Sequence, residues 1–227
     1  PMSDAPLLTA PTRAPLWRRF AARVTGHAIV FFARAITAVH ADWRGIEPST
    51  RQRVYFANHV SNADMPMIWS VLPLHLRLKT RPVAAADYWL KNRIRAFAGG
   101  EVFRAVLVDR RADQRTDDPM AAILQALDEG ASLIIFPEGL RNQGPVPLQP
   151  FKSGLFNIAE ARPDVELVPT WIANLNSVMP KGEIIPLPLM CSVSFGAPIK
   201  RAENEERRAF LTRAAEALLA LKPEERA

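Results

Sequence analysis

The sequence has few of the residues that form disulfides or bind structural metals in small domains. It has a single cysteine, Cys191, and four histidines among 227 residues. One cysteine cannot form an internal disulfide, and no group of cysteines and histidines has the spacing of a zinc site. The composition therefore favours a reducing compartment, and we expect neither a bound metal nor a resident cofactor.

Long apolar runs are also missing, although 48% of the residues are hydrophobic. The longest charge-free run near the N-terminus, residues 24–33, is about half of the roughly 20 residues that span a bilayer. A simple transmembrane helix is therefore not expected. The hydrophobic content is instead sufficient for one substantial globular core.

Acidic residues are outnumbered: 29 Lys and Arg face 23 Asp and Glu, a formal net charge of +6. Such a charge attracts an anionic partner, which can be nucleic acid, anionic lipid or a phosphorylated substrate. Aromatic and basic residues do not interleave into a base-stacking or groove-reading motif. We therefore expect no nucleic-acid partner.

The chain divides into three predicted parts. Residues 1–15 carry four prolines and read as a flexible arm. Residues 16–44 read as an amphipathic helical segment, in which Arg19, Arg23, His27 and Arg34 share one stripe beside a broad apolar face. This pattern fits a helix lying on an anionic membrane surface, or a helix covering the core of its own domain. Residues 45–222 form the main domain.

Strands and helices alternate through the main domain. Strands are expected at 53–57, 102–109, 133–136, 165–172 and 190–195, and helices at 63–71, 118–129, 151–161 and 204–221. This alternation predicts an α/β fold with a mixed, mostly parallel sheet flanked by helices.

The first chemical constellation is the segment 58–64, where an apolar strand runs into a helix. Histidine can accept a proton from an alcohol, and a carboxylate on its other ring nitrogen stabilises the imidazolium that forms. His59 and Asp64 can play these roles only if His59 lies on the loop and Asp64 in the first helical turn, because on one helix they would point apart. The alternative is a capping segment in which Asp64 only favours the helix dipole.

The second constellation, 136–142, reads Phe-Pro-Glu-Gly-Leu-Arg-Asn after a buried strand. Gly139 permits a tight turn, and Arg141 offers a planar fork of donors suited to a phosphate or carboxylate. By itself, this segment fits a surface turn with an ion pair between Glu138 and Arg141 better than a binding site.

Together the two segments resemble the glycerolipid acyltransferases, the family of 1-acylglycerol-3-phosphate (lysophosphatidate) acyltransferases. The first matches the family's Asn-His-x4-Asp block, and the second its Phe-Pro-Glu-Gly-Thr-Arg block with Leu140 in place of threonine. Further similar segments, in the family's order, are Val106–Arg110, Phe151–Gly154, Val168-Pro169 and Phe195–Ile199.

The resemblance implies a function and a set of site residues. His59 would deprotonate the hydroxyl of a lysophospholipid acceptor, with Asp64 orienting it, and the alkoxide would attack the thioester of acyl-CoA or acyl carrier protein without an acyl-enzyme. The residues expected to bind the acceptor are Arg110, Glu138, Gly139 and Arg141, and those expected to support the site are Asn58, Asn62 and Pro137. Arg110 could instead belong to a solvated basic cluster with Arg111.

Two departures leave the acceptor open. Ala84–Tyr88 replaces the lysine-rich segment of many family members, and Leu140 replaces threonine. A phosphate-facing cation is therefore missing, and a lyso-ornithine lipid or another single-chain acceptor is an alternative to lysophosphatidate. A non-catalytic membrane-binding module is a second alternative. The expected location is the cytoplasmic face of the cell membrane, as a peripheral protein of undetermined oligomeric state.

Overall fold

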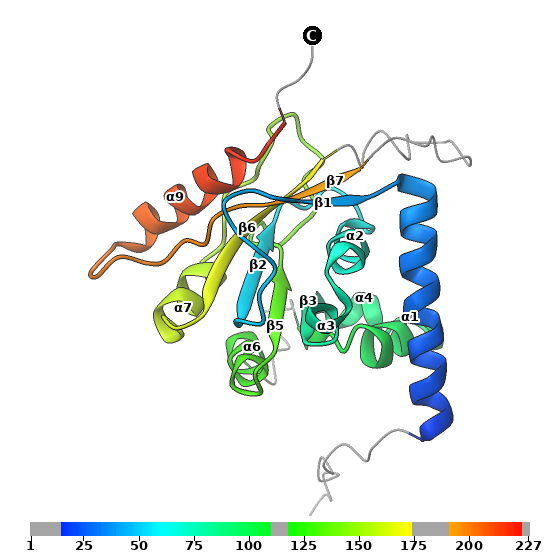
Figure 1. The fold of residues 1–227 in the computed structure, drawn as a ribbon. Coiled ribbons are helices and arrows are strands. Elements are labelled where there is room, and N and C mark those ends of the chain that lie inside the picture. The colour runs from blue at the N-terminus through cyan, green and yellow to red at the C-terminus, as the bar shows by residue number, and fades with distance from the viewer. Residues whose placement is uncertain (1–14, 110–117, 174–190, 224–227) are drawn as a thin grey trace, which may run out of the picture.

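The computed structural model describes residues 15–109, 118–173 and 191–223. A seven-stranded sheet runs through these residues in the order β1-β7-β6-β2-β5-β3-β4 (Figure 1). Its strands are β1 (His40–Trp43), β2 (Arg53–Ala57), β3 (Thr80–Ala85), β4 (Val106–Val108), β5 (Ser132–Ile135), β6 (Glu166–Ala173) and β7 (Ser192–Phe195). All neighbours are parallel except β6 and β7, so the sheet is mixed and mostly parallel, as predicted.

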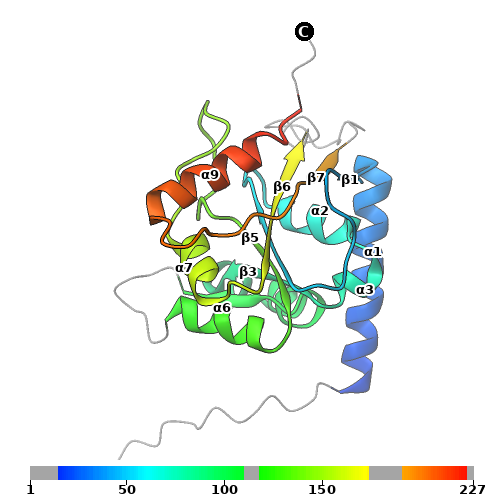
Figure 2. The same cartoon turned by 60° about the vertical axis from the view of Figure 1, so that its left-hand side comes forward.

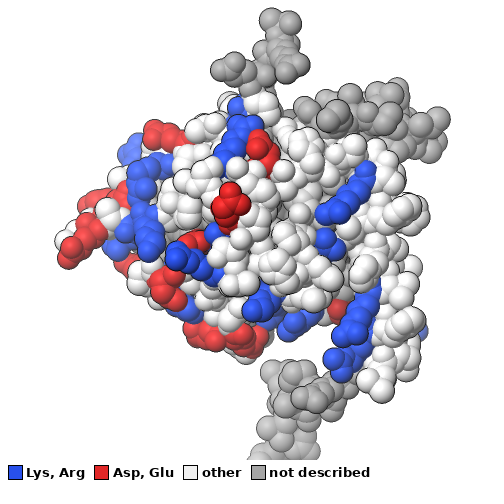
Figure 3. Space-filling model, in the orientation of Figure 1, with Lys and Arg blue, Asp and Glu red and all other residues white. Residues whose placement is uncertain are grey.

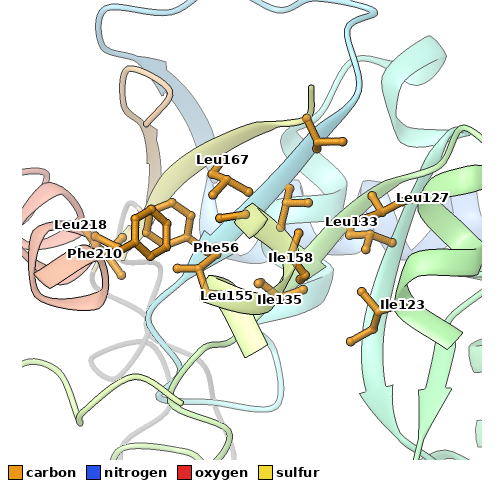
Figure 4. Packing of buried hydrophobic residues seen from close by; sticks show 14 of the residues in the cluster. Phe56, Ile123, Leu127, Leu133, Ile135, Leu155, Ile158, Leu167, Phe210 and Leu218 are labelled. Atoms are coloured by element: carbon orange, nitrogen blue, oxygen red, sulfur yellow. The ribbon is translucent and has the colours of Figure 1, made fainter. Parts of the chain in front are cut away.

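Alternating residues of the central strands face two separate cores. Phe56 of β2 and Leu133 of β5 pack with α6 (Pro119–Asp128), α7 (Gly154–Ala161) and α9 (Arg207–Leu219) (Figure 4). Tyr55 and Ile134, their neighbours in sequence, pack on the opposite face with α2 (Asp64–Val71). Figure 2 shows the sheet between these two groups of helices. The expected α/β fold with helices flanking a sheet is therefore confirmed.

The helix α1 (Leu16–Thr37) lies along the α2 side of the sheet (Figure 1). Gly26 allows the close approach, because a Cβ there would lie 3.3 Å from the Trp69 ring. Arg34 fixes the far end through a hydrogen bond from Nη2 to the Ser70 carbonyl at 3.1 Å. The face turned away from the sheet exposes large apolar side chains: Leu16, Trp17, Phe20, Val24, Phe31, Phe32 and Ile36.

The predicted helical segment 16–44 is too long. The helix ends at Thr37, because Ala38 adopts a left-handed conformation with φ of 46°. The chain then forms β1, which pairs in parallel with β7. The sheet domain therefore begins at His40 and not at residue 45.

Several other elements differ from the prediction. Most of the predicted strand 102–109 is absent, since only Val106–Val108 pairs with β3. The segment between α2 and β4 was not anticipated at all. It contains β3 and four short helices: α3 (Leu74–Arg77), α4 (Ala86–Trp89), α5 (Arg93–Phe97) and the π-helix η1 (Ala98–Val102). The other predicted strands and helices are present within a few residues of their expected ends.

Candidate active site

His59 and Asp64 meet at the carboxyl end of β2. His59 lies on the loop that follows the strand, and Asp64 is the first residue of α2. The imidazole Nδ1 lies 2.8 Å from Asp64 Oδ2, and the carboxylate is fully buried. The predicted placement on loop and first helical turn is therefore present, and it leaves Nε2 of His59 to meet a substrate.

The Asp64 carboxylate also folds the loop that carries His59. Oδ2 accepts hydrogen bonds from the N–H groups of Val60 and Ser61 at 2.7 and 2.8 Å. These two N–H groups are therefore already engaged within the loop. Ala63 occupies the N-cap position of α2 and makes no side-chain cap.

The second segment, residues 136–142, forms hydrogen bonds with both backbone groups of His59. Glu138 Oε1 accepts the His59 N–H at 2.8 Å, and the Asn142 N–H donates to the His59 carbonyl at 2.6 Å. The other Glu138 oxygen accepts the Gln149 N–H at 2.7 Å. Burial raises the pKa of Glu138, against the opposing effect of these two backbone donors. Both carboxylate oxygens are thus used within the protein.

This arrangement changes the place of Glu138. The resemblance implied that it lines the acceptor site, but Glu138 is 4% exposed and does not line the adjoining cavity. Its position fits a residue that holds the catalytic loop. Asn142, which the sequence did not single out, also holds a loop. Its side chain forms hydrogen bonds with the backbone of Val146 and Gly144 and with the side chain of Gln149.

The backbone conformation at position 139 requires a glycine. Its φ is +76°, and a Cβ would lie 2.8 Å from the Lys152 side chain. Pro137 precedes this turn and accepts the Lys152 N–H at 2.9 Å. Asn58 joins the end of β2 to β6, because its side-chain amide exchanges two hydrogen bonds with the backbone of Ile172, at 3.1 and 2.8 Å. Pro137 and Asn58 therefore join the segments that carry the site to neighbouring parts of the fold.

A cavity of about 410 Å³ opens beside His59. The Phe136 ring stacks on the imidazole, with centroids 4.2 Å apart, and forms part of the wall. The remaining wall comes from the end of β3, from α4 and from the second segment: Pro82–Ala85, Asp87, Tyr88, Trp89, Leu140, Arg141 and Gln143, together with Asn62 and Met65. Its volume is in the range of small-molecule sites.

Arg141 is the cation of this cavity. It is exposed, and within the described parts of the chain its side chain has no ion pair or hydrogen bond. The structure therefore brings Arg141 together with His59, and places Asn62 at the same cavity. Arg110, the other predicted phosphate-binding arginine, lies outside the described residues.

The sequence and the fold are both similar to those of known acyltransferases. A model of the acyltransferase family matches residues 40–173. No curated protein matches the sequence. Among solved structures, the fold is similar to that of the 1-acyl-sn-glycerophosphate acyltransferase PlsC of Thermotoga maritima, with a TM-score of 0.66 and 19% identity over 92% of this chain and 88% of that one. The chain therefore belongs to the acyltransferase family.

Proposed function

We propose that the protein transfers a fatty acyl group from a thioester donor to the free hydroxyl of a lysophospholipid, with 1-acylglycerol-3-phosphate as the acceptor and phosphatidate as the product. The observation that carries this proposal is the His59–Asp64 pair, with Nδ1 bound by a buried carboxylate and the ring at the wall of a cavity of about 410 Å³. Family membership supports acyl transfer as the reaction class.

The reaction follows from this geometry. Nε2 of His59 takes the proton of the acceptor hydroxyl as the oxygen attacks the thioester carbonyl, and Asp64 stabilises the imidazolium. The tetrahedral intermediate collapses, the carbon–sulfur bond breaks, and the thiolate recovers the proton from His59. No acyl-enzyme forms. Arg141 holds the acceptor's phosphate, since a guanidinium can bind two phosphate oxygens at once.

A second acceptor class is favoured by one observation. Asp87 lines the same cavity as Arg141, so the charged side chains of its wall include an acid as well as a base. A carboxylate repels a phosphate dianion and attracts an amine. A headgroup with both charges, such as that of a lyso-ornithine lipid, would suit this wall.

We further propose that α1 attaches the protein to a membrane as a peripheral protein on the cytoplasmic face. Its apolar outer face is flanked by Arg19 and Arg23, and Figure 3 shows strips of basic side chains along this edge. Apolar side chains can enter the lipid while guanidinium groups meet the phosphates. No helix in the described residues is both long enough and apolar enough to cross a bilayer.

The test is product analysis over a matrix of donors and acceptors. The purified protein is incubated with acyl-CoA or acyl carrier protein and with lysophosphatidate, a lyso-ornithine lipid or an uncharged monoacylglycerol, and products are identified by mass spectrometry. Diacylated product from lysophosphatidate supports the proposal, and product only from the amine-bearing lipid supports the second acceptor class. Lipid binding without product from any pair would identify a non-catalytic membrane module instead.

A further inference from the structure

The chain leaving the cavity wall at Trp89 exposes two large apolar side chains. Leu90 is 60% exposed and Ile94 is 82% exposed, the highest value among the large apolar side chains described. A single exposed leucine is ordinary on a protein surface. Two such residues within five positions, directly after the cavity-lining residues Tyr88 and Trp89, form an apolar projection beside the cavity.

This projection is held by ordered local structure. The Asn92 side chain accepts the Arg95 N–H at 2.9 Å and so caps α5, on which Ile94 lies. The Arg95 guanidinium stacks over the ring of Tyr88, 4.4 Å from its centroid. Leu90 donates its N–H to the Ala86 carbonyl at 2.8 Å, which closes α4. The apolar groups are therefore presented to solvent by fixed backbone.

The charges of this segment have one sign. Lys91, Arg93 and Arg95 lie between or next to the two apolar residues, and residues 90–95 contain no acid. Exposed apolar side chains bordered by cations are the pattern that partitions into the interface of an anionic bilayer. The same charges disfavour the docking of a second copy through this face, since two identical basic patches repel each other.

The projection is continuous with two other features of the molecule. Leu140, 61% exposed, lines the same cavity. The π-helix η1, which follows α5, packs against α1 and is joined to it by an ion pair between Arg18 and Glu101. The segment 90–95 therefore lies between the cavity-lining residues Tyr88 and Trp89 and the π-helix that packs against α1.

We propose that residues 90–95, together with Leu140, form a cavity rim that rests on an anionic lipid bilayer. The rim gives the cavity direct access to the lipid phase, so that a single-chain acceptor moves from the membrane to His59 without crossing water. The inference rests on the proposed acyl transfer for its substrate. The contact itself is a separate physical property that lipid binding measures.

The chain offers a matched control for this rim. Leu74 and Leu78 are 50% and 60% exposed, but they precede the amino end of β3. The cavity is lined by Pro82–Ala85 near the carboxyl end of that strand. Replacing these leucines removes comparable exposed apolar surface at a distance from the cavity.

The experiment compares the parent, Leu90→Gln with Ile94→Gln, and Leu74→Gln with Leu78→Gln. Flotation with vesicles of phosphatidylcholine and phosphatidylglycerol measures binding. Acyl-CoA thiol release is measured with lysophosphatidate in these vesicles and with a short-chain lysophosphatidate below its micelle concentration. We expect the rim variant to lose about tenfold or more in vesicle affinity, because two apolar anchors are removed. Its ratio of vesicle rate to dissolved-acceptor rate should fall similarly, while the control pair resembles the parent.

Three results would overturn the proposal. One is unchanged vesicle binding by the rim variant, and a second is an equal loss in the Leu74 and Leu78 variant. The third is a parent dimer in sedimentation velocity that the rim substitutions dissociate, which would make the rim a self-association surface. Absence of thiol release with every acceptor would refute the acyl-transfer function alone, because the flotation comparison would still be readable.

Discussion

Buried charged side chains have different kinds of partner at the two ends of the central strands. At the amino end, Arg53, 4% exposed, donates from Nε to Glu166 at 2.8 Å, and Arg51 donates to the same carboxylate at 3.0 Å. At the carboxyl end, the buried carboxylates of Asp64 and Glu138 accept from backbone N–H groups and from one imidazole, and no described lysine or arginine pairs with them.

This comparison distinguishes a carboxylate that stabilises the fold from one that is proposed to act in catalysis. Burial raises the pKa of Glu166, but the two arginines outweigh it and leave the pKa below its usual range. The positive charges of the two arginines cancel most of the electrostatic potential of this carboxylate, so it can stabilise a nearby reacting group only weakly. In the proposed mechanism, Asp64, which is held by backbone N–H groups and one imidazole, stabilises the imidazolium that forms on His59. Arg141 remains available to a substrate because neither acid pairs with it.

The largest effect on turnover among the acidic residues is expected at Asp64. Asp64→Asn keeps the shape of the side chain but removes the charge that stabilises the imidazolium. We expect kcat to fall by about 10³–10⁴-fold, as for the equivalent change in a histidine–aspartate pair. Steady-state thiol release measures it, with Asp128→Asn on the surface of α6 as control. An Asp64→Asn enzyme within tenfold of the parent would remove Asp64 from the mechanism.

Arg141→Gln should raise KM for lysophosphatidate by about 10–100-fold, because charge-assisted hydrogen bonds contribute about 1.5–3 kcal/mol. The effect on an uncharged monoacylglycerol should be much smaller. The control is Arg207→Gln at the start of α9, an exposed arginine away from the cavity. Equal losses on both acceptors would show that Arg141 does not read the phosphate.

Glu138→Gln is expected to lower kcat by about tenfold with little change in KM, because one of the two backbone N–H groups loses its acceptor and the His59 loop loosens. The matched control is Glu160→Gln on the surface of α7. A rise in KM without a change in kcat would instead restore Glu138 to the acceptor site.

The difference in unfolding free energy between the parent and the Glu138→Gln variant should depend on pH. Burial raises the folded-state pKa of Glu138, so its contribution to stability is full below the unfolded pKa, about 4.3, and is lost as the pH rises through the folded value. The stability of the parent relative to Glu138→Gln should therefore decline from pH 4 to neutrality. Urea unfolding across this range measures it, and a relative stability that increases with pH would contradict the assignment.

Glu166→Gln should have the smallest effect on turnover, within about twofold, because it lies at the opposite end of the strands. We expect a stability loss of about 1–2 kcal/mol at neutral pH. The folded-state pKa is lowered, so the stability is present above the unfolded pKa and is lost as the pH falls through the folded value. Chemical unfolding at pH 7 and pH 3.5 checks this, and a loss that persists at the lower pH would exclude the ion pair as its source.

The sequence predicted the site best where its chemistry is local. His59 and Asp64 are five residues apart, and a strand followed by a helix start determines their geometry. The role of Glu138 depends on contacts with His59 and Gln149 that only the folded sheet creates, and no sequence pattern separates a loop-holding acid from a ligand-binding one. The segment from β3 to η1 was missed because its helices are too short to show a period and because proline, here Pro82 inside β3, argues against a strand in a sequence.

The β1 error has a different cause. The apolar positions of α1 continue at helical spacing as far as Val39, so the segment 16–44 was predicted to be helical. The single left-handed residue Ala38 ends it, and pairing with β7 stabilises the strand instead. An unaligned sequence contains no signal for that partner, which lies about 150 residues away.

His59 is proposed to be the base of an acceptor-dependent acyl transfer. The most direct test is the release of free thiol from acyl-CoA with and without lysophosphatidate, in the parent and in His59→Ala. We expect release that requires the acceptor and falls by about 10³-fold or more in the variant. Release that is independent of the acceptor, or that survives in His59→Ala, would contradict it.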